Sequence, residues 1–386
     1  MINILFIHQS ADLYGSDKTL LLLLKNLDKK KFNPVVVIPI DGPLKTELEN
    51  NNIEVYIAPA LKLYRKIFTP KNILKFFSEH KTAVKFLDTL NEKHHFDIVY
   101  SNTLAILLGI IYAKKRKIKH IWHVHEIIES PKIFTSVFSK ILQSKSNTKI
   151  VYNSIATQKF WNTNKKIYEK SQVIWNGLEA PQKYITKEEK ALIRLKYYNS
   201  KPDEIVIGLI GRISRWKGQL FLLNSFIKAA KNQPNLKLVF IGSPPPNQEE
   251  FLENLNNNIK KNQISNQVLI IPFQENIFSF WQSIDIAIVP STEPEPFGLV
   301  AVEAMLAQKP VIAANHGGLP EIVIDGQTGI LFEPNNEDEL TKAIQYLVNN
   351  PKTRIEMGEN GRQRAVQTFS IASYIQNLEN IFLTMK

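Results

Sequence analysis

Two glutamates in the segment from Glu295 to Glu303 form the arrangement with the clearest chemical use in this 386-residue sequence. The segment reads EPFGLVAVE and follows the apolar run 286–289, which predicts a buried strand, a loop and a helix that begins near Gly298. Free N–H groups at a helix N-terminus favour a phosphate group, and carboxylates accept hydrogen bonds from hydroxyl groups. We therefore expect Glu295 to meet a sugar and Glu303 a ribose. The expected phosphate contacts are Phe297, Gly298 and Leu299.

A second group of polar residues, GRISRWKG, follows the apolar run 205–210. A strand, a glycine-flanked loop that carries cations and then a helix are typical of a diphosphate clamp. Arg212 can bind two phosphate oxygens with its planar guanidinium, and Lys217 can add a point charge. Together they would stabilise a departing nucleoside diphosphate.

Alternating elements must position these residues. Short β-branched runs alternate with amphipathic stretches, which predicts βαβ units and parallel sheets buried on both faces. The alternation of strand and helix patterns starts again after about residue 180. Because a single hydrophobic core stops growing at roughly 250–300 residues, we expect two domains, at 1–180 and 181–369. The strands expected in the first are 35–38, 98–100, 150–152 and 173–175, and those in the second are 205–210, 237–241, 268–271, 286–289, 310–313 and 330–332.

The motifs of the second half resemble those of family 4 of the retaining glycosyltransferases. In chain order they are Gly211-Arg212, Lys217-Gly218, Glu295-Pro-Phe-Gly with Glu303, Gly317-Gly318-Leu-Pro-Glu321 and Asp325-Gly-Gln-Thr-Gly329. The resemblance implies the GT-B fold, with two Rossmann-like, doubly wound α/β domains facing a central cleft. It also implies transfer of a sugar, with retention of configuration, from a UDP- or GDP-sugar that is a substrate. Neither a metal nor another cofactor is expected.

Roles for particular residues follow from the same resemblance. Arg212 and Lys217 would hold the donor diphosphate, while Glu295 and Glu303 would serve the donor sugar and the ribose. The nucleotide base would stack near Phe273, in the loop after the third predicted strand of the second domain. A final helix at about 370–386 would cross back to the first domain.

The first domain, which the resemblance assigns to the acceptor, carries a loop and a histidine of the family pattern. The loop YGSDK places Gly15 and Ser16 on the acceptor side, with one glycine where the family commonly has two. Two histidines occur in His123-Val124-His125-Glu126. His125, which Glu126 follows, fits the family position better and joins Arg212, Lys217 and Glu295 as an expected catalytic residue; His123 stays an open alternative.

Composition excludes several classes of chemistry. There are no cysteines, which removes disulfides, thiolate metal sites and cysteine nucleophiles. The net charge is +12, and residues 1–180 hold 27 Lys/Arg against 15 Asp/Glu, whereas the rest of the chain holds 21 of each. The positive excess therefore belongs to the first half, which indicates a polyanionic partner there.

An anionic membrane surface is the partner that we expect, through the stretch Lys62–Lys85 and the cluster Lys114–Lys117. An ordinary solvated helix face explains the same residues, and no nucleic-acid-binding module accompanies them. The N-terminus predicts a buried strand and not a signal peptide, and the longest apolar run is too short to span a bilayer. We expect a cytoplasmic enzyme, peripherally bound to the membrane, that uses a glycan or lipid-linked acceptor in surface-glycan biosynthesis. A catalytically inactive GT-B subunit or a membrane-bound scaffold is the alternative.

Overall fold

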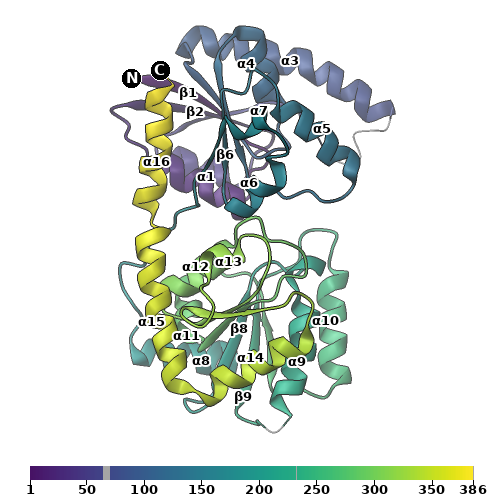
Figure 1. Ribbon diagram of the computed structural model, residues 1–386, viewed down its shortest axis with the longest axis vertical. Helices are drawn as coiled ribbons and strands as arrows, with labels where there is room; N and C mark the ends of the chain where they lie inside the picture. The colour runs from purple at the N-terminus through teal and green to yellow at the C-terminus, as the bar shows by residue number, and fades with distance from the viewer. Residues whose placement is uncertain (64–69, 232, 386) are drawn as a thin grey trace. The chain divides into compact units, whose positions relative to one another are not determined.

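The computed structural model describes residues 1–63, 70–231 and 233–385, with the backbone alone at 70–75 and 77. The chain divides into two compact units, the first made of residues 1–177 and 371–386 and the second of residues 178–370. Each unit contains a parallel sheet between helices (Figure 1). The α/β class that the sequence predicts is confirmed in both units.

In the described part of the first unit, seven parallel strands form a sheet of order β3-β2-β1-β4-β5-β6-β7. The strands are β1 (Ile2–Ile7), β2 (Phe32–Ile38), β3 (Glu54–Ile57), β4 (Ile98–Asn102), β5 (Lys119–Val124), β6 (Lys149–Tyr152) and β7 (Ser171–Val173). The helices are α1 (Gly15–Asn26), α2 (Pro43–Asn50), α3 (Pro70–His94), α4 (Leu108–Arg116), α5 (Lys132–Leu142), α6 (Ile155–Trp161), α7 (Lys165–Tyr168) and α16 (Ile371–Thr384).

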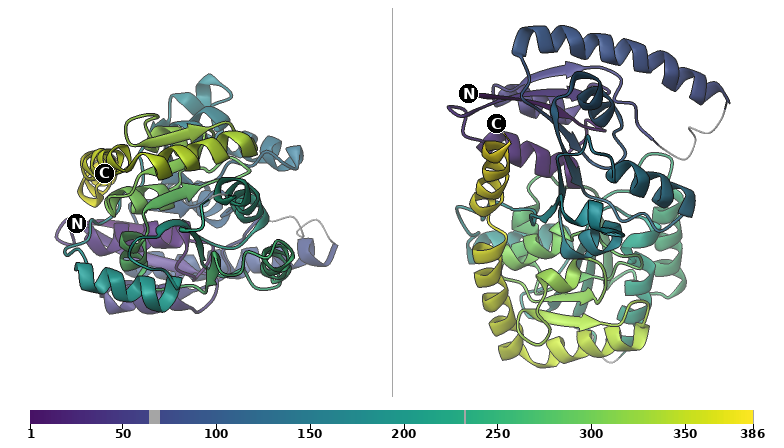
Figure 2. Two further views of the ribbon diagram at one scale, coloured as in Figure 1. Left: turned by 90° about the horizontal axis from the view of Figure 1, so that it is seen from below. Right: turned by 45° about the horizontal axis from the view of Figure 1, so that its top comes forward.

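Strand β1 shows why the first sheet needs helices on both faces. Side chains alternate across a strand, so Ile4 and Phe6 enter one hydrophobic cluster while Leu5 and Ile7 enter another. The first cluster includes residues of α1, α2 and α16, and the second includes residues of α3 and α4. Accordingly, α3 and α16 lie on opposite sides of this sheet (Figure 2).

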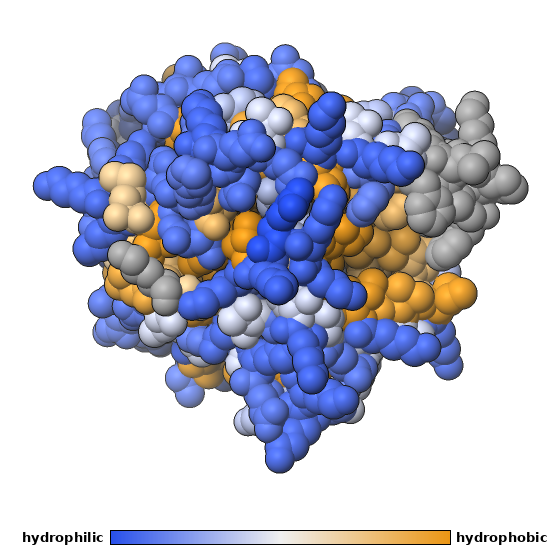
Figure 3. All heavy atoms as spheres, turned by 90° about the horizontal axis from the view of Figure 1, so that it is seen from above, coloured by the Kyte–Doolittle hydropathy of each residue, from blue (hydrophilic) through white to orange (hydrophobic). Residues whose placement is uncertain are grey.

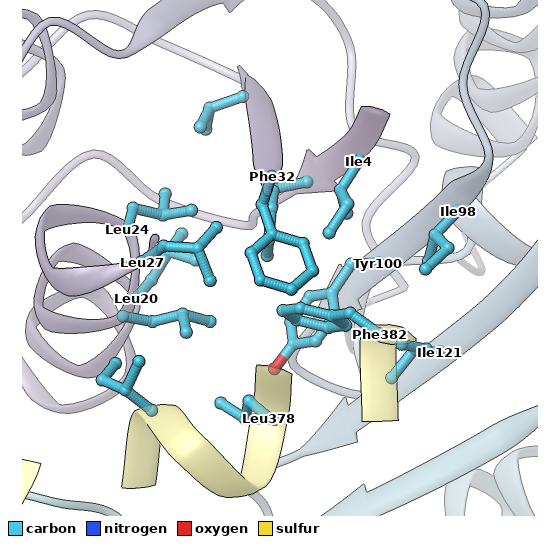
Figure 4. Close-up of a cluster of buried hydrophobic side chains, with 14 of the residues drawn as sticks. Ile4, Leu20, Leu24, Leu27, Phe32, Ile98, Tyr100, Ile121, Leu378 and Phe382 are labelled. Atoms are coloured by element: carbon cyan, nitrogen blue, oxygen red, sulfur yellow. The ribbon is translucent and has the colours of Figure 1, made fainter. Parts of the chain in front are cut away.

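The last helix, α16, completes the core of the first unit. Its buried residues recur at helical spacing and form one apolar stripe. Phe382 has its ring 5.7 Å from that of Phe32 and 5.9 Å from that of Tyr100, with Leu378 one turn away (Figure 4). Burying a Phe or Leu side chain contributes about 1.5–3 kcal/mol, so this stripe fastens the C-terminus to the first sheet.

The second unit repeats the pattern, and six parallel strands within its described residues have the order β10-β9-β8-β11-β12-β13. The strands are β8 (Ile205–Ile210), β9 (Leu236–Ile241), β10 (Val268–Ile271), β11 (Ile286–Val289), β12 (Val311–Ala314) and β13 (Gly329–Phe332). The helices are α8 (Lys187–Tyr198), a 3-10 turn (Arg215–Lys217), α9 (Gln219–Ala230), α10 (Glu250–Lys261), α11 (Ile277–Ser283), α12 (Leu299–Leu306), α13 (Leu319–Ile322), α14 (Glu337–Asn349) and α15 (Pro351–Thr368).

Both sheets reverse their strand order at one point. The first does so between β1 and β4 and the second between β8 and β11. In open parallel sheets, ligands bind beyond the carboxyl ends of the strands at such a point. Each unit therefore has one place where polar side chains gain access to a ligand.

Candidate functional site

Two loops lie side by side at the reversal point of the second unit, one after β8 and one after β11. Gly218 ends the first loop with φ +78°, and a Cβ atom there would lie 2.2 Å from the carbonyl oxygen of Pro290. Only glycine allows that approach. The Thr292 N–H donates to the carbonyl oxygen of Trp216 at 2.9 Å, which joins the two loops.

The joined loops bring Lys217 and Glu295 into a buried ion pair. Lys217 Nζ lies 2.5 Å from Glu295 Oε1, and the two side chains are 14% and 6% exposed. The Ser291 hydroxyl donates to the same Oε1 at 2.6 Å. Oε2 of Glu295 accepts no hydrogen bond from the part of the chain that the structure describes, so it is the oxygen available to a ligand.

Backbone contacts hold Glu295 from the other side. The Gly318 N–H donates to the carbonyl oxygen of Glu295 at 2.7 Å, and His316 Nε2 lies 2.8 Å from the carbonyl oxygen of Ser291. Gly317 has φ +58°, and a Cβ atom there would lie 2.2 Å from the Glu295 carbonyl oxygen. The Gly317-Gly318 motif thus packs directly on the loop that carries the glutamate.

Arg212 is a second cation of this loop, and it lies at the carboxyl end of β8. The residue is exposed, and the Gln219 side-chain amide donates to its carbonyl oxygen at 2.8 Å. Because Gln219 belongs to the first turn of α9, this bond ties the loop to the helix that follows. Arg212 and Lys217 therefore lie at the two ends of the same loop. Arg212 is exposed to solvent, and Lys217 pairs with Glu295.

Helix α12 begins directly after this loop, one residue later than the sequence predicts. Its N-cap is Gly298, with φ +112°, where a Cβ atom would lie 2.7 Å from the Leu319 side chain. The Phe297 side chain is buried, with its ring 5.8 Å from that of Phe369. Phe297 therefore has only its backbone groups to offer to a ligand at this end of the helix, whereas Leu299 is half-buried and its only polar groups are those of the backbone.

The remaining residues of the predicted donor set differ in exposure. Glu303 is buried inside α12, and the indole N–H of fully buried Trp281 donates to its Oε2 at 3.3 Å. Phe273, after β10, is 48% exposed, and its N–H donates to the Ser243 hydroxyl at 3.1 Å. An exposed aromatic ring beside a sheet's carboxyl edge offers a stacking surface.

The reversal point of the first unit carries a different set of side chains. His8 follows β1, Asn102 ends β4 and His125 follows β5. His8 Nε2 lies 2.7 Å from Asp17 Oδ1, Asn102 Nδ2 lies 3.0 Å from His8 Nδ1, and His125 Nε2 lies 3.0 Å from Asn102 Oδ1. Asp17 is the third residue of α1, and its Oδ2 accepts from the Tyr14 N–H at 3.3 Å.

The predicted acceptor loop touches this set through its backbone. Gly15 opens α1 with φ +40°, a value that favours glycine. The carbonyl oxygen of Ser16 accepts a hydrogen bond from Asn102 Nδ2 at 3.3 Å. The Asn102 amide thus links Ser16 to His8 and His125.

The two candidate histidines differ in their surroundings. His123 is fully buried in β5, its Nδ1 lies 2.6 Å from the Tyr100 hydroxyl, and burial lowers its pKa to about 3. His125 is partly exposed; burial, together with the neighbouring His123 and His8, lowers its pKa well below the ordinary value. Both are neutral at pH 7, and only His125 has exposed surface to offer a ligand.

Glu126, next to His125, is a structural carboxylate. Its Oε2 accepts from the backbone N–H groups of Leu104 and His125, at 2.9 and 3.0 Å. Burial nevertheless raises its pKa to about 7. Its contacts fix the path of the chain on either side of the histidine.

Some residues of these networks were not found from the sequence. The ones missed are His8, Asn102, Ser291 and Trp281. His8 and Asn102 could have been found, because each is a polar residue at the carboxyl end of an apolar run. Ser291 and Trp281 carry no such signal, since their roles depend on contacts that only the fold creates.

Several expectations concern other parts of the molecule. Within residues 1–63, 70–231 and 233–385, no cluster of His, Asp or Glu has the geometry of a metal site. No helix in those ranges is long and apolar enough to cross a bilayer.

A cavity of about 430 Å³ lies at the amino ends of β11 and β12, at the opposite end of the strands from the loops described above. Its lining residues include Lys190, Asp285, Lys309 and Arg354.

Comparisons with known proteins match both units. The family model described as Glycosyltransferase Family 4 matches residues 14–180, and the model described as Glycosyl transferases group 1 matches residues 195–364. An uncharacterized glycosyltransferase of Methanocaldococcus jannaschii is 30% identical over 325 residues, 82% of this chain and 81% of the relative. The capsular polysaccharide biosynthesis glycosyltransferase CapM of Staphylococcus aureus is 25% identical over 371 residues, 87% of this chain and 91% of CapM.

A solved structure agrees with these matches. The structure of Anabaena HepE in complex with UDP and glucose superposes with a TM-score of 0.84, at 25% identity and with 100% of both chains covered. The two doubly wound sheets, the two family models and these relatives lead to one conclusion: the chain is a glycosyltransferase of the group 1, family 4 class and has the GT-B fold.

Proposed function

We propose that this glycosyltransferase transfers a sugar from a UDP- or GDP-sugar to a glycan or lipid-linked acceptor in surface-glycan biosynthesis, with retention of configuration and without a metal. The observation that carries the proposal is the buried Lys217–Glu295 pair beside Arg212, at the reversal point of the second sheet. Relatives support the choice of donor and product. HepE was solved with UDP and glucose, and CapM is named for capsular polysaccharide biosynthesis.

The second unit would bind the donor. Arg212 and Lys217 would neutralise the diphosphate, helped by the N–H groups at the start of α12. Oε2 of Glu295 would accept a hydrogen bond from the sugar and Glu303 one from the ribose, while Phe273 would stack on the base. The interactions with the two cations strengthen as the diphosphate departs and its negative charge grows, which favours the transition state.

The first unit would bind the acceptor, with Gly15 and Ser16 on that side and His125 in contact with the transferred sugar. Retention would follow from departure and attack on one face of the sugar. The bond from the anomeric carbon to the phosphate oxygen breaks, the bond to the acceptor oxygen forms, and the acceptor proton passes to the departing phosphate. No protein nucleophile is needed in that route.

Peripheral attachment to the inner face of an anionic membrane in the cytoplasm is also part of the proposal. Residues 114–117 are exposed at the end of α4, although Arg116 pairs with Asp88. Hydrophilic residues cover most of the face of the molecule in Figure 3, the side that is uppermost in Figure 1. Lys62 is exposed, whereas Arg65, Lys66 and the side chains of Lys71 and Lys75 lie outside the described residues.

The decisive experiment is a thermal-shift and turnover series with UDP, GDP and ADP and their sugars. A ligand that binds only the native state raises Tm, by an amount that corresponds to about 2.7 kcal/mol at a hundred times its Kd. We expect UDP or GDP to do so, and Arg212→Ala to abolish most of the shift and to cut turnover by roughly 10²–10³. The matched control is Arg215→Ala, three residues along the same loop, where the side chain is exposed and pairs with Glu293.

Three outcomes would contradict the proposal. Donor-type nucleotides without any effect on Tm, together with no donor hydrolysis or transfer, would favour an inactive subunit or scaffold. An inverted product, identified by the NMR coupling constant of its anomeric proton, would exclude retention. Loss of activity in EDTA that a divalent cation restores would exclude metal independence.

A further inference from the structure

A hydrogen-bonded chain of four side chains runs across the carboxyl ends of three neighbouring strands in the first unit. The β1–β4 register pairs Ile7 with Ser101, and the β4–β5 register pairs Asn102 with His123. His8, Asn102 and His125 therefore lie at adjacent strand ends. The three contacts, from Asp17 to His8, from His8 to Asn102 and from Asn102 to His125, measure 2.7, 3.0 and 3.0 Å.

The direction of every hydrogen bond in this chain can be assigned from Asn102. Its Nδ2 lies 3.3 Å from the carbonyl oxygen of Ser16, which can only accept, so Nδ2 must face that oxygen. The other N–H of the same amide points to His8 Nδ1, which must therefore carry a lone pair. Oδ1 of the amide is then the atom that faces His125.

The two ends of the chain agree with this assignment. With Nδ1 of His8 unprotonated, its proton is on Nε2, and it donates to the Asp17 carboxylate. The Ser10 hydroxyl donates to the same carboxylate oxygen. His8 and Asp17 are 0% and 5% exposed, so water does not compete for these bonds. His8 Nδ1 also lies 3.3 Å from the backbone oxygen of Asn102, a longer contact than the one to Nδ2.

At the other end, the Asn102 oxygen can only accept, so His125 must hold its proton on Nε2. His125 is neutral, because burial and the neighbouring His123 and His8 lower its pKa. A neutral imidazole with its proton on Nε2 has a lone pair on Nδ1. The atom that remains for a ligand is thus an acceptor, and it fits a hydroxyl group that donates.

We propose that Asp17, His8 and Asn102 are positioning residues that hold His125 in its neutral Nε2–H tautomer, so that Nδ1 accepts a hydrogen bond from a hydroxyl group of the sugar substrate. The inference rests on the proposed function, in which His125 contacts that sugar. It adds a requirement on the substrate, because a bound sugar that lacks this hydroxyl group would cover the Nδ1 acceptor and leave it unpaired.

The first test reads the tautomer directly. In the full chain labelled with ¹⁵N-histidine, we expect His125 to show a protonated Nε2 and an unprotonated Nδ1 at pH 7, and His8 to show the same. Asn102→Ala should mix the tautomers of His125, whereas Asn102→Asp, which keeps an oxygen towards His125, should preserve its Nε2–H form. His125 protonated on Nδ1, or His8 as an imidazolium, in the unmodified protein would overturn the proposal.

The second test measures turnover and its dependence on pH. We expect Asn102→Ala to lower kcat about tenfold, the worth of roughly one hydrogen bond, with Asn102→Asp recovering part of the loss. The acidic limb of the pH profile should move in Asn102→Ala, because removing the amide opens space for water beside His125 and so weakens the burial that lowers its pKa. Combining Asn102→Ala with His125→Ala should cost no more than His125→Ala alone, since residues that act as a unit are not additive.

A matched control is available in the same unit. Asn147 makes a 2.7 Å contact to Nδ1 of buried His120, away from the strand-end chain. Asn147→Ala should destabilise the fold but leave the tautomer of His125 and the pH profile unchanged.

The results separate this inference from the proposed function. A normal turnover in His125→Ala with the tautomer held as described would remove His125 from the reaction but leave the positioning chain intact. A low turnover in His125→Ala, with neither tautomer nor turnover changed in Asn102→Ala, would overturn the positioning chain alone.

Discussion

Replacing Lys217 with methionine tests the electrostatics of the proposed donor site without any substrate. The methionine keeps an apolar stem of similar length but removes the charge that lies 2.5 Å from Glu295. Glu295 then remains buried, with the Ser291 hydroxyl still donating to it. A buried carboxylate that loses its cation must either stay charged in a poor environment or take up a proton.

The expected cost follows from the burial of the pair. Removing one partner of a buried ion pair destabilises a protein by about 3–5 kcal/mol. The Ser291 hydrogen bond and the residual 14% exposure of Lys217 reduce this, so we expect about 2–3 kcal/mol. For a unit of this size each kcal/mol lowers Tm by roughly 2–4 °C, so Tm should fall by about 4–12 °C.

The assay must report on the second unit alone, because the two units need not unfold together. Hydrogen exchange of amides in β8 and β11, followed by mass spectrometry, meets that need. The variants are Lys217→Met, Glu295→Gln and the two combined, and we expect a coupling energy above about 1.5 kcal/mol. Arg215→Met is the control, because its pair with Glu293 is exposed and should contribute less than about 1 kcal/mol.

Additive effects would contradict a stabilising contact between the two side chains. If the double variant lost as much stability as the sum of the single variants, the contact between Lys217 and Glu295 would contribute nothing. An equal loss in Arg215→Met would show that burial does not distinguish the two pairs.

Four further predictions concern other residues. Glu303→Ala should raise the donor KM and leave kcat nearly unchanged, because a contact to the ribose stabilises the ground state and the transition state equally. His125→Ala should lower kcat more than it raises KM. Steady-state kinetics that reverse this pattern would contradict both roles. Burial lowers the pKa of Lys309 from 10.5 to about 7. The unfolded chain therefore binds more protons between these pH values, and stability should rise with pH there, by at most about 4.8 kcal/mol at 1.36 kcal/mol per pKa unit. Because Lys309 lines an open cavity, we expect on the order of 1–2 kcal/mol, measured by urea unfolding at pH 7 and pH 9.5, and no such rise in Lys309→Met. Liposome co-sedimentation should need anionic lipid, weaken with salt and drop when Lys114, Lys115 and Lys117 become Glu; equal binding to neutral vesicles would exclude an electrostatic surface.

The strands of the second sheet illustrate what could be predicted from the sequence. Strands β8 and β11, at the centre of the sheet, begin and end where their apolar runs do, because a strand buried on both faces needs apolar residues at every position. The edge strand β7 was expected at 173–175 but lies at Ser171–Val173. An edge strand pairs on one side only, and its polar first residues still pair with β6.

Helix α15 was not predicted, and its glycines explain why. Gly358 and Gly361 lower the helix propensity of a polar stretch. A Cβ atom at Gly358 would lie 2.5 Å from the carbonyl oxygen of Gln308, so the glycine is needed for close packing after α12. A packing requirement between segments distant in sequence overrides local propensity, and a sequence pattern does not reveal it.

The candidate site was predicted residue by residue but not as a network. Lys217 and Glu295 could each be identified from a strand–loop–helix pattern. Their contact depends on β8 and β11 being neighbours in the sheet, although they are far apart in the chain. The same holds for His125, whose partner Asn102 ends the adjacent strand β4. Strand order, which the local pattern does not contain, decides which polar residues meet.

The two networks differ in the kind of partner that each carboxylate has, and the difference matches the chemistry proposed for each unit. Both Glu295 and Asp17 accept a hydrogen bond from a serine hydroxyl. Glu295 faces a permanent cation, so its charge is cancelled locally, and in the proposed reaction Arg212 would stabilise the charge that a departing diphosphate gains. In the proposed network Asp17 accepts a hydrogen bond from Nε2–H of His8, so it fixes the direction of the hydrogen bonds that lead to His125. A donor site must balance a charge that changes during the reaction. A histidine that orients a sugar hydroxyl group must instead keep one protonation state. Buried neutral partners keep the protonation state of such a histidine constant.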